Sequence, residues 1–429
     1  MSHIYRIGVA LILVLLSVSI MIVAEEDAVV QRTEGGVLET PAVIRDWAIL
    51  FYCNADFRGS NVADVFAQRV QSRENVAVLM LEDTYDAEAT LWHVEGGADS
   101  PVLVALEDWG EIDMGDDETL TRFLQFAQTW YPSRRTMVML YSHGHGWRGV
   151  SYDDHPSADG SVDTTWLTPD EISAALLSVG GIDALLLTSP CNTGAMEFSY
   201  EVRNAVELFV ASEAVSSFYV WKESLPLILE SLASDPQLEI EALAKDIPNW
   251  AQATYDREFW TDQLSQDKHH LIPTAVLSSA AGGDVMTVLA QALDVFSRTL
   301  IEALGDYGEQ ITQARMSSQS FAYQAFVDAY DLASNCASIP GMQEASKALE
   351  AATLGAVTYS VTDPNSHPRA HGLSLFFPMN SDRAMSDQSF HDQYGFGFYE
   401  EDYRTAGLDL LADTHWDEFL VAFYEELLD

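Results

Sequence analysis

The sequence predicts an α/β protein with a mostly parallel central sheet flanked by helices and an α/β C-terminal extension. Apolar runs of strand length at residues 136–142, 182–189 and 208–213 alternate with helical patterns at 168–181 and 195–207. The connections between these segments are short. Strands that alternate with helices in this way are expected to run parallel in one sheet, joined by right-handed crossovers.

The chain before this stretch predicts more of the same sheet. Residues 47–57 form an apolar run that ends in a polar loop, and residues 74–83 form a second run of strand length. Residues 88–97 alternate between apolar and polar, which is typical of a hairpin strand. Residues 116–131 place apolar side chains at helical spacing, with acidic residues in the first turn.

The helix at 168–181 has a complete set of end signals. Thr168 is the expected N-cap, Pro169 the first helical residue, and Glu171 completes a capping box. Gly180 and Gly181 end the helix.

Beyond residue 220 the patterns are weaker. They predict strands at 274–281, 355–361 and 371–378, a long helix at 285–304 and an amphipathic helix at 414–428.

The N-terminus predicts export. Arg6 precedes an apolar run from residue 7 to residue 24, and acidic residues follow, which is the order of a signal peptide. A run of this length is also near the minimum for spanning a bilayer, so an uncleaved membrane anchor is the alternative. We interpret residues 1–24 as signal peptide or anchor and 25–44 as a linker, and expect the protein to be secreted or on the cell surface.

The composition excludes some partners. Of 429 residues, 66 are acidic and 21 basic, which gives a formal net charge of −45. Such a surface repels nucleic acid and anionic lipid, so no nucleic-acid partner is expected. Salt screens the self-repulsion, which fits a halophilic source; an ordinary acidic exported protein fits equally well.

The three cysteines are too few for a disulfide scaffold. Cys53 and Cys336 either pair or stay as buried thiols, and the sequence leaves both readings open. The odd count predicts at least one free thiol.

A thiol and an imidazole are expected at one edge of the sheet. His143 follows the strand at 136–142 and Cys191 follows the strand at 182–189. Neighbouring parallel strands lie about 4.8 Å apart, and open α/β folds place their sites at the carboxyl ends of the strands. Cys191 can then act as nucleophile with His143 as base, and the N–H groups of Gly144 and Cys191 as oxyanion donors. The alternative is a buried structural cysteine and a strand-end histidine.

A catalytic zinc site is disfavoured. The candidate ligands are His143, His145, Asp153, Asp154 and His155. Trp147 stands where a His-x-His-x-Asp-His motif would have its aspartate, and the chain has no Cys-x-x-Cys pair.

The segments "YSHGHGW" and "LLLTSPCNTGAMEFSYEVRNAVELFVASEAV" resemble the clostripain family of cysteine peptidases, which has the caspase–hemoglobinase fold. "EIDMGDDETLTRFLQFAQTWYP", "HGLSLFFP" and "HWDEFL" extend the likeness. It implies a cysteine endopeptidase acting on protein or peptide substrates, with a catalytic domain at 45–285 and a region at 286–429 that packs on or completes it. It also assigns His143 as base, Cys191 as nucleophile and Gly144 as oxyanion donor.

The family resemblance implies no cofactor for the chemistry, although some members use calcium. The acidic loop at 151–165 offers Asp153 and Asp154 as calcium ligands, or it is simply a solvated loop.

The sequence departs from the family in its expected substrate pocket. The family commonly has an aspartate two residues before the cysteine, where this chain has Ser189, and a pocket acid after a downstream tryptophan, where Lys222 follows Trp221. With Glu213, these residues are expected to contribute to the pocket. We therefore predict a primary specificity shifted away from Arg and Lys toward neutral or acidic residues.

Two other functions remain open from the sequence. One is a transferase or self-processing enzyme that uses the same thioester. The other is an extracellular binding module on a peptidase scaffold whose catalysis has decayed.

Overall fold

The structure is a computed structural model. It describes residues 31–33, 43–55, 62–96, 101–162, 164–214, 216, 218–255, 273–277, 285–321, 325–362, 367–378 and 403–428. The expected signal peptide or anchor, residues 1–24, lies outside these ranges. Within them, none of the helices has the length and apolar character needed to cross a bilayer.

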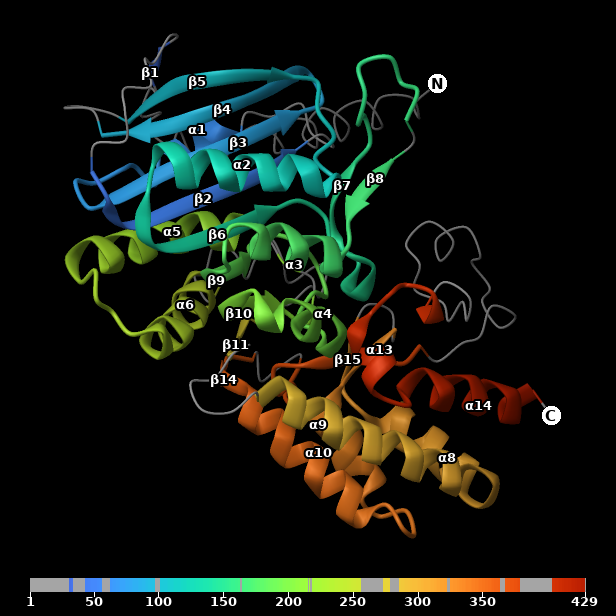
Figure 1. Cartoon of the computed structure of the whole chain (residues 1–429). Helices are drawn as coiled ribbons and strands as arrows, with labels where there is room; N and C mark the ends of the chain where they lie inside the picture. The colour runs from blue at the N-terminus through green and yellow to red at the C-terminus, as the bar shows by residue number, and fades with distance from the viewer. Residues whose placement is uncertain are drawn as a thin grey trace, which may run out of the picture.

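Ten strands of the described chain form one large sheet. They are β1 (Gln31–Thr33), β2 (Arg45–Ala55), β3 (Val76–Thr84), β4 (Ala87–Glu95), β5 (Val102–Gly110), β6 (Ser133–Tyr141), β9 (Ile182–Leu187), β10 (Val206–Ser212), β11 (Pro273–Leu277) and β14 (Val357–Ser360). Their order in space is β1-β5-β4-β3-β2-β6-β9-β10-β11-β14, from the top of Figure 1 downwards.

The centre of the sheet is parallel, as the sequence predicts. Strands β3, β2, β6, β9 and β10 are consecutive neighbours and pair in parallel. Antiparallel pairs extend the sheet on both sides, through β4 and β5 at one side and β11 and β14 at the other. Strand β1 lies within the segment expected to be a linker. Its backbone pairs with the edge of β5.

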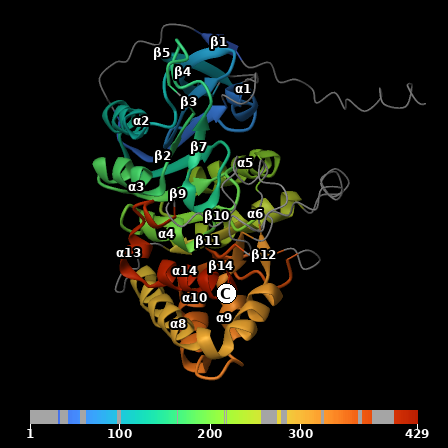
Figure 2. The same cartoon turned by 90° about the vertical axis from the view of Figure 1, so that its right-hand side faces the viewer.

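Helices cover both faces of this sheet. One face carries α2 (Asp117–Trp130), α3 (Pro169–Ser178) and α4 (Met196–Glu201), and the other α1 (Val62–Ala67), α5 (Phe218–Ser234) and α6 (Ile240–Tyr255). Figure 2, turned by 90°, shows the two groups on opposite sides. The central strands are therefore buried on both faces, which explains their nearly continuous apolar sequences.

Strand β2 shows how one strand supplies both cores. Leu50 and Tyr52 point into the core under α2 and α3, whereas Ile49 and Phe51 point into the core under α1 and α5. This is the two-residue alternation of a strand. Each such buried side chain contributes about 1.5–3 kcal/mol relative to an exposed one.

The local end signals of α3 act as predicted. The Thr168 side chain and the Glu171 carboxylate form a capping box, and Pro169 is the first helical residue. The box satisfies N–H groups that have no partner inside the helix.

A C-terminal part of the chain packs at the lower end of the sheet (Figure 1). Its helices are α8 (Val285–Ser317), α9 (Ala329–Cys336), α10 (Gln343–Ala356), α13 (Asp409–Asp413) and α14 (Trp416–Leu428). Its small antiparallel sheet joins β12 (Ser320–Phe321), β13 (Phe326–Asp328) and β15 (Ser374–Phe376). The same region supplies β14 to the main sheet, so it is part of the main fold and not a separate appendage.

Candidate active site

The candidate site lies where β6 and β9 end. These strands pair in parallel, with Leu140 opposite Leu187. Just beyond, the backbone N–H of Thr188 donates to the carbonyl of Leu140 at 3.1 Å. His143 therefore begins one loop and Cys191 lies in the next, at the same edge of the sheet.

The two loops touch at Gly144. A Cβ added to Gly144 would stand 2.6 Å from the Cβ of Pro190 and 3.0 Å from the backbone nitrogen of Cys191. Only glycine allows so close an approach of the two backbones. The side chain of His143, the residue before this contact, is exposed.

Residues of the C-terminal part pack against Gly146 and Trp147 of the histidine loop. Gly146 has a φ of 61° and lies under the ring of Phe326 in β13, which a Cβ at this position would overlap. The ring of Trp147 packs edge-on against Phe376 and Tyr403, with centroids 5.6 and 5.0 Å away. The histidine loop thus lies between the main sheet and the C-terminal part.

The cysteine loop is tied to the end of β10. The N–H of Asn192, a residue with a φ of 58°, donates to Ala214 at 3.0 Å, and the N–H of Gly194 donates to Ser212 at 2.8 Å. Asparagine tolerates this left-handed conformation better than most residues. The loop is also tied to the C-terminal part, because the N–H of Ser374 donates to the carbonyl of Gly194 at 2.9 Å.

The thiol of Cys191 is partly exposed and faces two carbonyl groups. Its Sγ lies 3.9 Å from the carbonyl oxygens of Ser189 and Ser216. Burial raises the pKa of this thiol, and a hydrogen bond with the Ser216 backbone offsets part of the effect. A neutral thiol is therefore favoured in this conformation, not the thiolate expected from a neighbouring imidazole.

His145 is a neutral, packed residue. Its ring lies 4.2 Å from that of Tyr152, which in turn stacks on Trp166. Burial, helped by the charges of His143 and Arg148, lowers the pKa of His145 to about 4.

The expected pocket residues differ in their surroundings. Ser189 is partly exposed, next to the thiol. Trp221 is fully buried and donates its indole N–H to the Ser216 hydroxyl at 3.1 Å. It therefore supports the segment of chain beside Cys191 from the protein interior. Glu213 is also fully buried and accepts the N–H of Gly372 at 2.9 Å. The side chain of Lys222, a residue of α5, lies outside the described part.

The two aspartates proposed as calcium ligands in the acidic loop make hydrogen bonds within the protein. Asp153 is buried, and its two oxygens accept the N–H groups of Met114 and His155 at 2.8 and 2.9 Å. Asp154 is exposed and accepts the hydroxyl of Thr164. No group of three or more metal-ligating side chains exists among the residues described. The loop instead forms the hairpin of β7 (Val150–Asp153) and β8 (Thr165–Leu167).

The remaining cysteines are structural. Cys53 and Cys336 are buried and unpaired in the described structure, and burial raises the pKa of both thiols. Cys53 belongs to the core on one face of the sheet and Cys336 to the core on the other, so a disulfide between them is not formed.

Sequence reasoning missed Ser216, Phe326 and Gly372, which support the two loops. No local pattern distinguishes these residues, because each acts through a contact far away in the chain. Gly194, which also supports the cysteine loop, carries only a weak signal in the sequence. A Cβ there would stand 2.7 Å from the nitrogen of Glu213, and this close approach explains a glycine three residues after the cysteine.

The central sheet and its flanking helices form a caspase-like α/β fold, with His143 and Cys191 on neighbouring loops at one edge of the sheet. The clostripain family model matches residues 62–422, and the chain belongs to this family. It is a cysteine peptidase. A comparison with curated protein sequences gives no significant match.

Solved structures of C11 proteases have the same fold. A secreted C11 cysteine protease from Bacteroides thetaiotaomicron, bound to an irreversible peptide inhibitor, matches with a TM-score of 0.63 and 16% identity, over 87% of this chain and 99% of that chain. An inactive zymogen C11 protease from Parabacteroides distasonis gives 0.59 and 17%, over 87% and 99%. Another structure of a secreted C11 protease from Bacteroides thetaiotaomicron, iotapain, gives 0.62 and 13%, over 87% and 100%.

Proposed function

We propose that the chain is an exported cysteine endopeptidase in which Cys191 is the nucleophile and His143 the general base. The observation that carries the proposal is the close approach of Gly144 to the Cys191 backbone, which brings the histidine loop and the thiol to one edge of the sheet. Membership of the clostripain family supplies the reaction class.

The reaction follows from this arrangement. His143 takes the proton of the Cys191 thiol, and the sulfur attacks the carbonyl carbon of the scissile peptide. The N–H groups of Gly144 and Cys191 stabilise the oxyanion. The C–N bond then breaks, and the imidazolium gives its proton to the leaving amine. Water, deprotonated by His143, hydrolyses the thioester and releases a carboxylic acid and the free thiol.

The protonation state of the Cys191 thiol before substrate binds determines how the reaction starts. Burial favours the protonated form of Cys191, so the proton must move to His143 when substrate enters. Displacement of water by substrate strengthens the attraction between thiolate and imidazolium. The substrate itself therefore promotes formation of the nucleophile.

Export is part of the proposal. It is supported by the basic, apolar and polar order of residues 1–26 and by structural relatives that are described as secreted. These two observations favour protein or peptide substrates that lie outside the cytoplasm.

Single substitutions at the two residues test the proposal. Cys191→Ala and His143→Ala should each reduce peptide hydrolysis by at least about 10³-fold while leaving the circular dichroism spectrum unchanged. His145→Ala is the matched control and should retain most activity. Hydrolysis that survives both substitutions would contradict the dyad, and a wild-type protein without hydrolysis would favour the binding-module alternative.

A further inference from the structure

The segment "HGLSLFFP" begins at His371 and runs into β15, and the proposed reaction gives it no role. In the structure it contacts the start of α9 at one end and the loop that carries Cys191 at the other. Three of its first four residues make polar contacts, and each end of the segment is held by hydrogen bonds.

Ser374 binds the segment to the cysteine loop. Its backbone N–H and its hydroxyl both donate to the carbonyl of Gly194, at 2.9 and 3.1 Å. Gly194 follows Cys191 by three residues in the chain. Ser374 is fully buried, so water does not compete for these two bonds. The position of the segment therefore determines the position of the cysteine loop.

Glu213 connects the same segment to the end of β10. It accepts the N–H of Gly372, a residue whose φ of 105° favours glycine, at 2.9 Å. The carbonyls on either side of Glu213 accept the N–H groups of Gly194 and Asn192 in the cysteine loop. Glu213 is fully buried, so it does not contact substrate, contrary to the expectation from the sequence.

Asp328, the N-cap residue of α9, binds the other end of the segment. Its fully buried carboxylate accepts the backbone N–H of His371 and, at 3.1 Å, Nδ1 of the same residue. It also accepts the N–H of Asp331 at 2.7 Å, which caps the helix. In the small sheet, Asp328 is the strand partner of Ser374. The residue that binds His371 thus lies opposite the residue that binds the cysteine loop.

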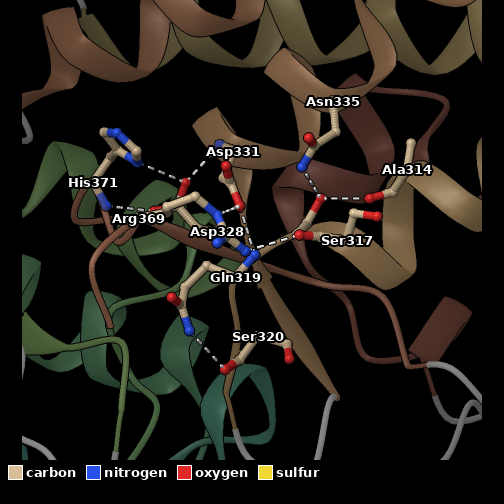
Figure 3. Close-up of polar contacts among 10 residues, drawn as sticks. Ala314, Ser317, Gln319, Ser320, Asp328, Asp331, Asn335, Arg369 and His371 are labelled. Atoms are coloured by element: carbon tan, nitrogen blue, oxygen red, sulfur yellow. Dashed lines mark hydrogen bonds and ion pairs between the residues drawn. The ribbon is translucent and has the colours of Figure 1, made fainter. Parts of the chain in front are cut away.

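A second carboxylate at the start of α9 holds the same loop, as Figure 3 shows. Asp331 accepts Nε of Arg369 at 3.0 Å. His371 points at Asp328 from two residues further along the loop. The His371 ring also stacks on the ring of Tyr330, with centroids 4.2 Å apart. The start of α9 therefore fixes both the backbone and the ring of His371.

The buried carboxylate of Asp328 depends on its donors. A charged oxygen that loses a hydrogen bond away from water costs more than an ordinary hydrogen bond, so the surrounding backbone shifts to replace the lost donor. Because Asp328 is paired with Ser374, such a shift reaches Gly194 across one strand pair. A displacement of about 1 Å at reacting groups lowers a rate by about 10²-fold.

We propose that His371 is a positioning residue for Cys191, because its bond to Asp328 fixes the 371–374 segment and this segment fixes the cysteine loop. This inference rests on the proposed function. The His371 imidazole takes no part in the proton transfers, which belong to His143. Its removal should therefore lower kcat and leave KM nearly unchanged, since no contact with substrate is lost.

The test compares His371→Ala with His371→Asn. Alanine removes the ring donor to Asp328, whereas the side-chain amide of asparagine offers an N–H close to the position of Nδ1 and carries no charge. In folded His371→Ala, as judged by circular dichroism, kcat should fall by at least about tenfold, with KM within about threefold of wild type. In His371→Asn, kcat should return to within about threefold of wild type.

His367→Ala is the matched control. It removes an imidazole from the same loop, but one that stacks on the ring of Phe321 with centroids 5.2 Å apart. This variant should keep kcat within about twofold of wild type, because small changes in packing outside the 371–374 segment do not reach the cysteine loop.

Three results overturn the inference. They are an unchanged kcat in folded His371→Ala, a raised KM with unchanged kcat, and a folded His371→Asn that is as slow as the alanine variant. If His371→Ala does not fold, Ser374→Ala replaces it. This variant removes only the hydroxyl bond to Gly194 and should lower kcat by at least about threefold, and an unchanged kcat overturns the inference. Hydrolysis that does not depend on Cys191 and His143 refutes the proposed function instead.

Discussion

The backbone of Gly144 lies against the backbone of Cys191, with only 3.0 Å between the nitrogen of Cys191 and the point where a Cβ of residue 144 would be. Parallel pairing of β6 and β9 produces this contact, because both loops leave the sheet at the same edge. The contact has consequences that substitutions can measure.

Gly144→Ala should disable the site. The added methyl would meet Pro190 and the backbone of Cys191, which cannot move as a flexible side chain can. We expect kcat/KM to fall by about 10²-fold or more, because small displacements of reacting groups have effects of that size. The free energy of unfolding should fall by about 1–3 kcal/mol. Gly305→Ala, in α8 with no atom within 4 Å of the added Cβ, is the control and should leave activity unchanged.

Gly146→Ala tests the support that the C-terminal part gives to the histidine loop. Gly146 and Gly160 both have positive φ values, 61° and 66°, but only Gly146 has the Phe326 ring above it. The left-handed backbone costs either alanine about 1–2 kcal/mol. Gly146→Ala should lose more stability than this and should also lose activity, whereas Gly160→Ala should show neither effect. Adding Phe326→Ala should restore part of the loss, and purely additive substitutions would show that the ring is not the cause.

Stability should fall as pH rises from 5 to 8. Burial is the main cause that raises the pKa values of Glu197 and Glu201 to about 7, from an ordinary 4.5. Their raised pKa values mean that the stability they contribute is complete below about 4.5 and is lost as pH rises through about 7. A shift of this size at the fully buried Glu197 corresponds to a free energy on the order of 3 kcal/mol.

Urea unfolding across this pH range checks the prediction. Measurements in 1 M salt shorten the screening length to about 3 Å and so suppress the general repulsion of the acidic surface. Glu197→Gln should flatten the pH dependence, whereas Glu309→Gln, at an exposed position, should not. A flat wild-type profile would show that these glutamates are ionised in the folded protein.

Ser189 should reduce the preference for basic substrates. It lies next to the thiol, at the position where the resemblance to the clostripain family implies an aspartate, and it provides no charge to pair with Arg or Lys. A peptide library should show cleavage after neutral or acidic residues. Ser189→Asp should raise kcat/KM for an Arg reporter by at least about tenfold, the equivalent of about 1.4 kcal/mol. Efficient cleavage of Arg and Lys reporters by the wild type would refute the altered preference.

The sequence predicted the parallel centre of the sheet because its signals are local. The apolar runs before His143 and Cys191 became β6 and β9, and the capping signals around Thr168 and Glu171 became the start of α3. Both kinds of signal depend on neighbouring residues only.

Helices α5 and α6 were not predicted, for an equally physical reason. Helices α5 and α6 carry Pro226 and Pro248 inside them, and proline disfavours a helix interior. Tertiary packing of Leu225 and Ile247 against the sheet outweighs that preference.

The supports of the candidate site could not be predicted either. The contacts of Gly146 with Phe326 and of Glu213 with Gly372 join residues that are far apart in the chain and that no local pattern links. The same limit explains why Trp221 and Glu213, expected beside the substrate, are buried beneath the loops.

Labelling with a thiol-reactive peptide probe, mapped by mass spectrometry, tests the central claim most directly. Cys53 and Cys336 are buried, so only Cys191 should react in the folded protein. The account predicts fast modification at Cys191 that slows by at least about 10²-fold in His143→Ala and stays near the wild-type rate in His145→Ala. Labelling of Cys191 at the same rate with and without the His143 imidazole, or no labelling at all in the folded wild type, would contradict it.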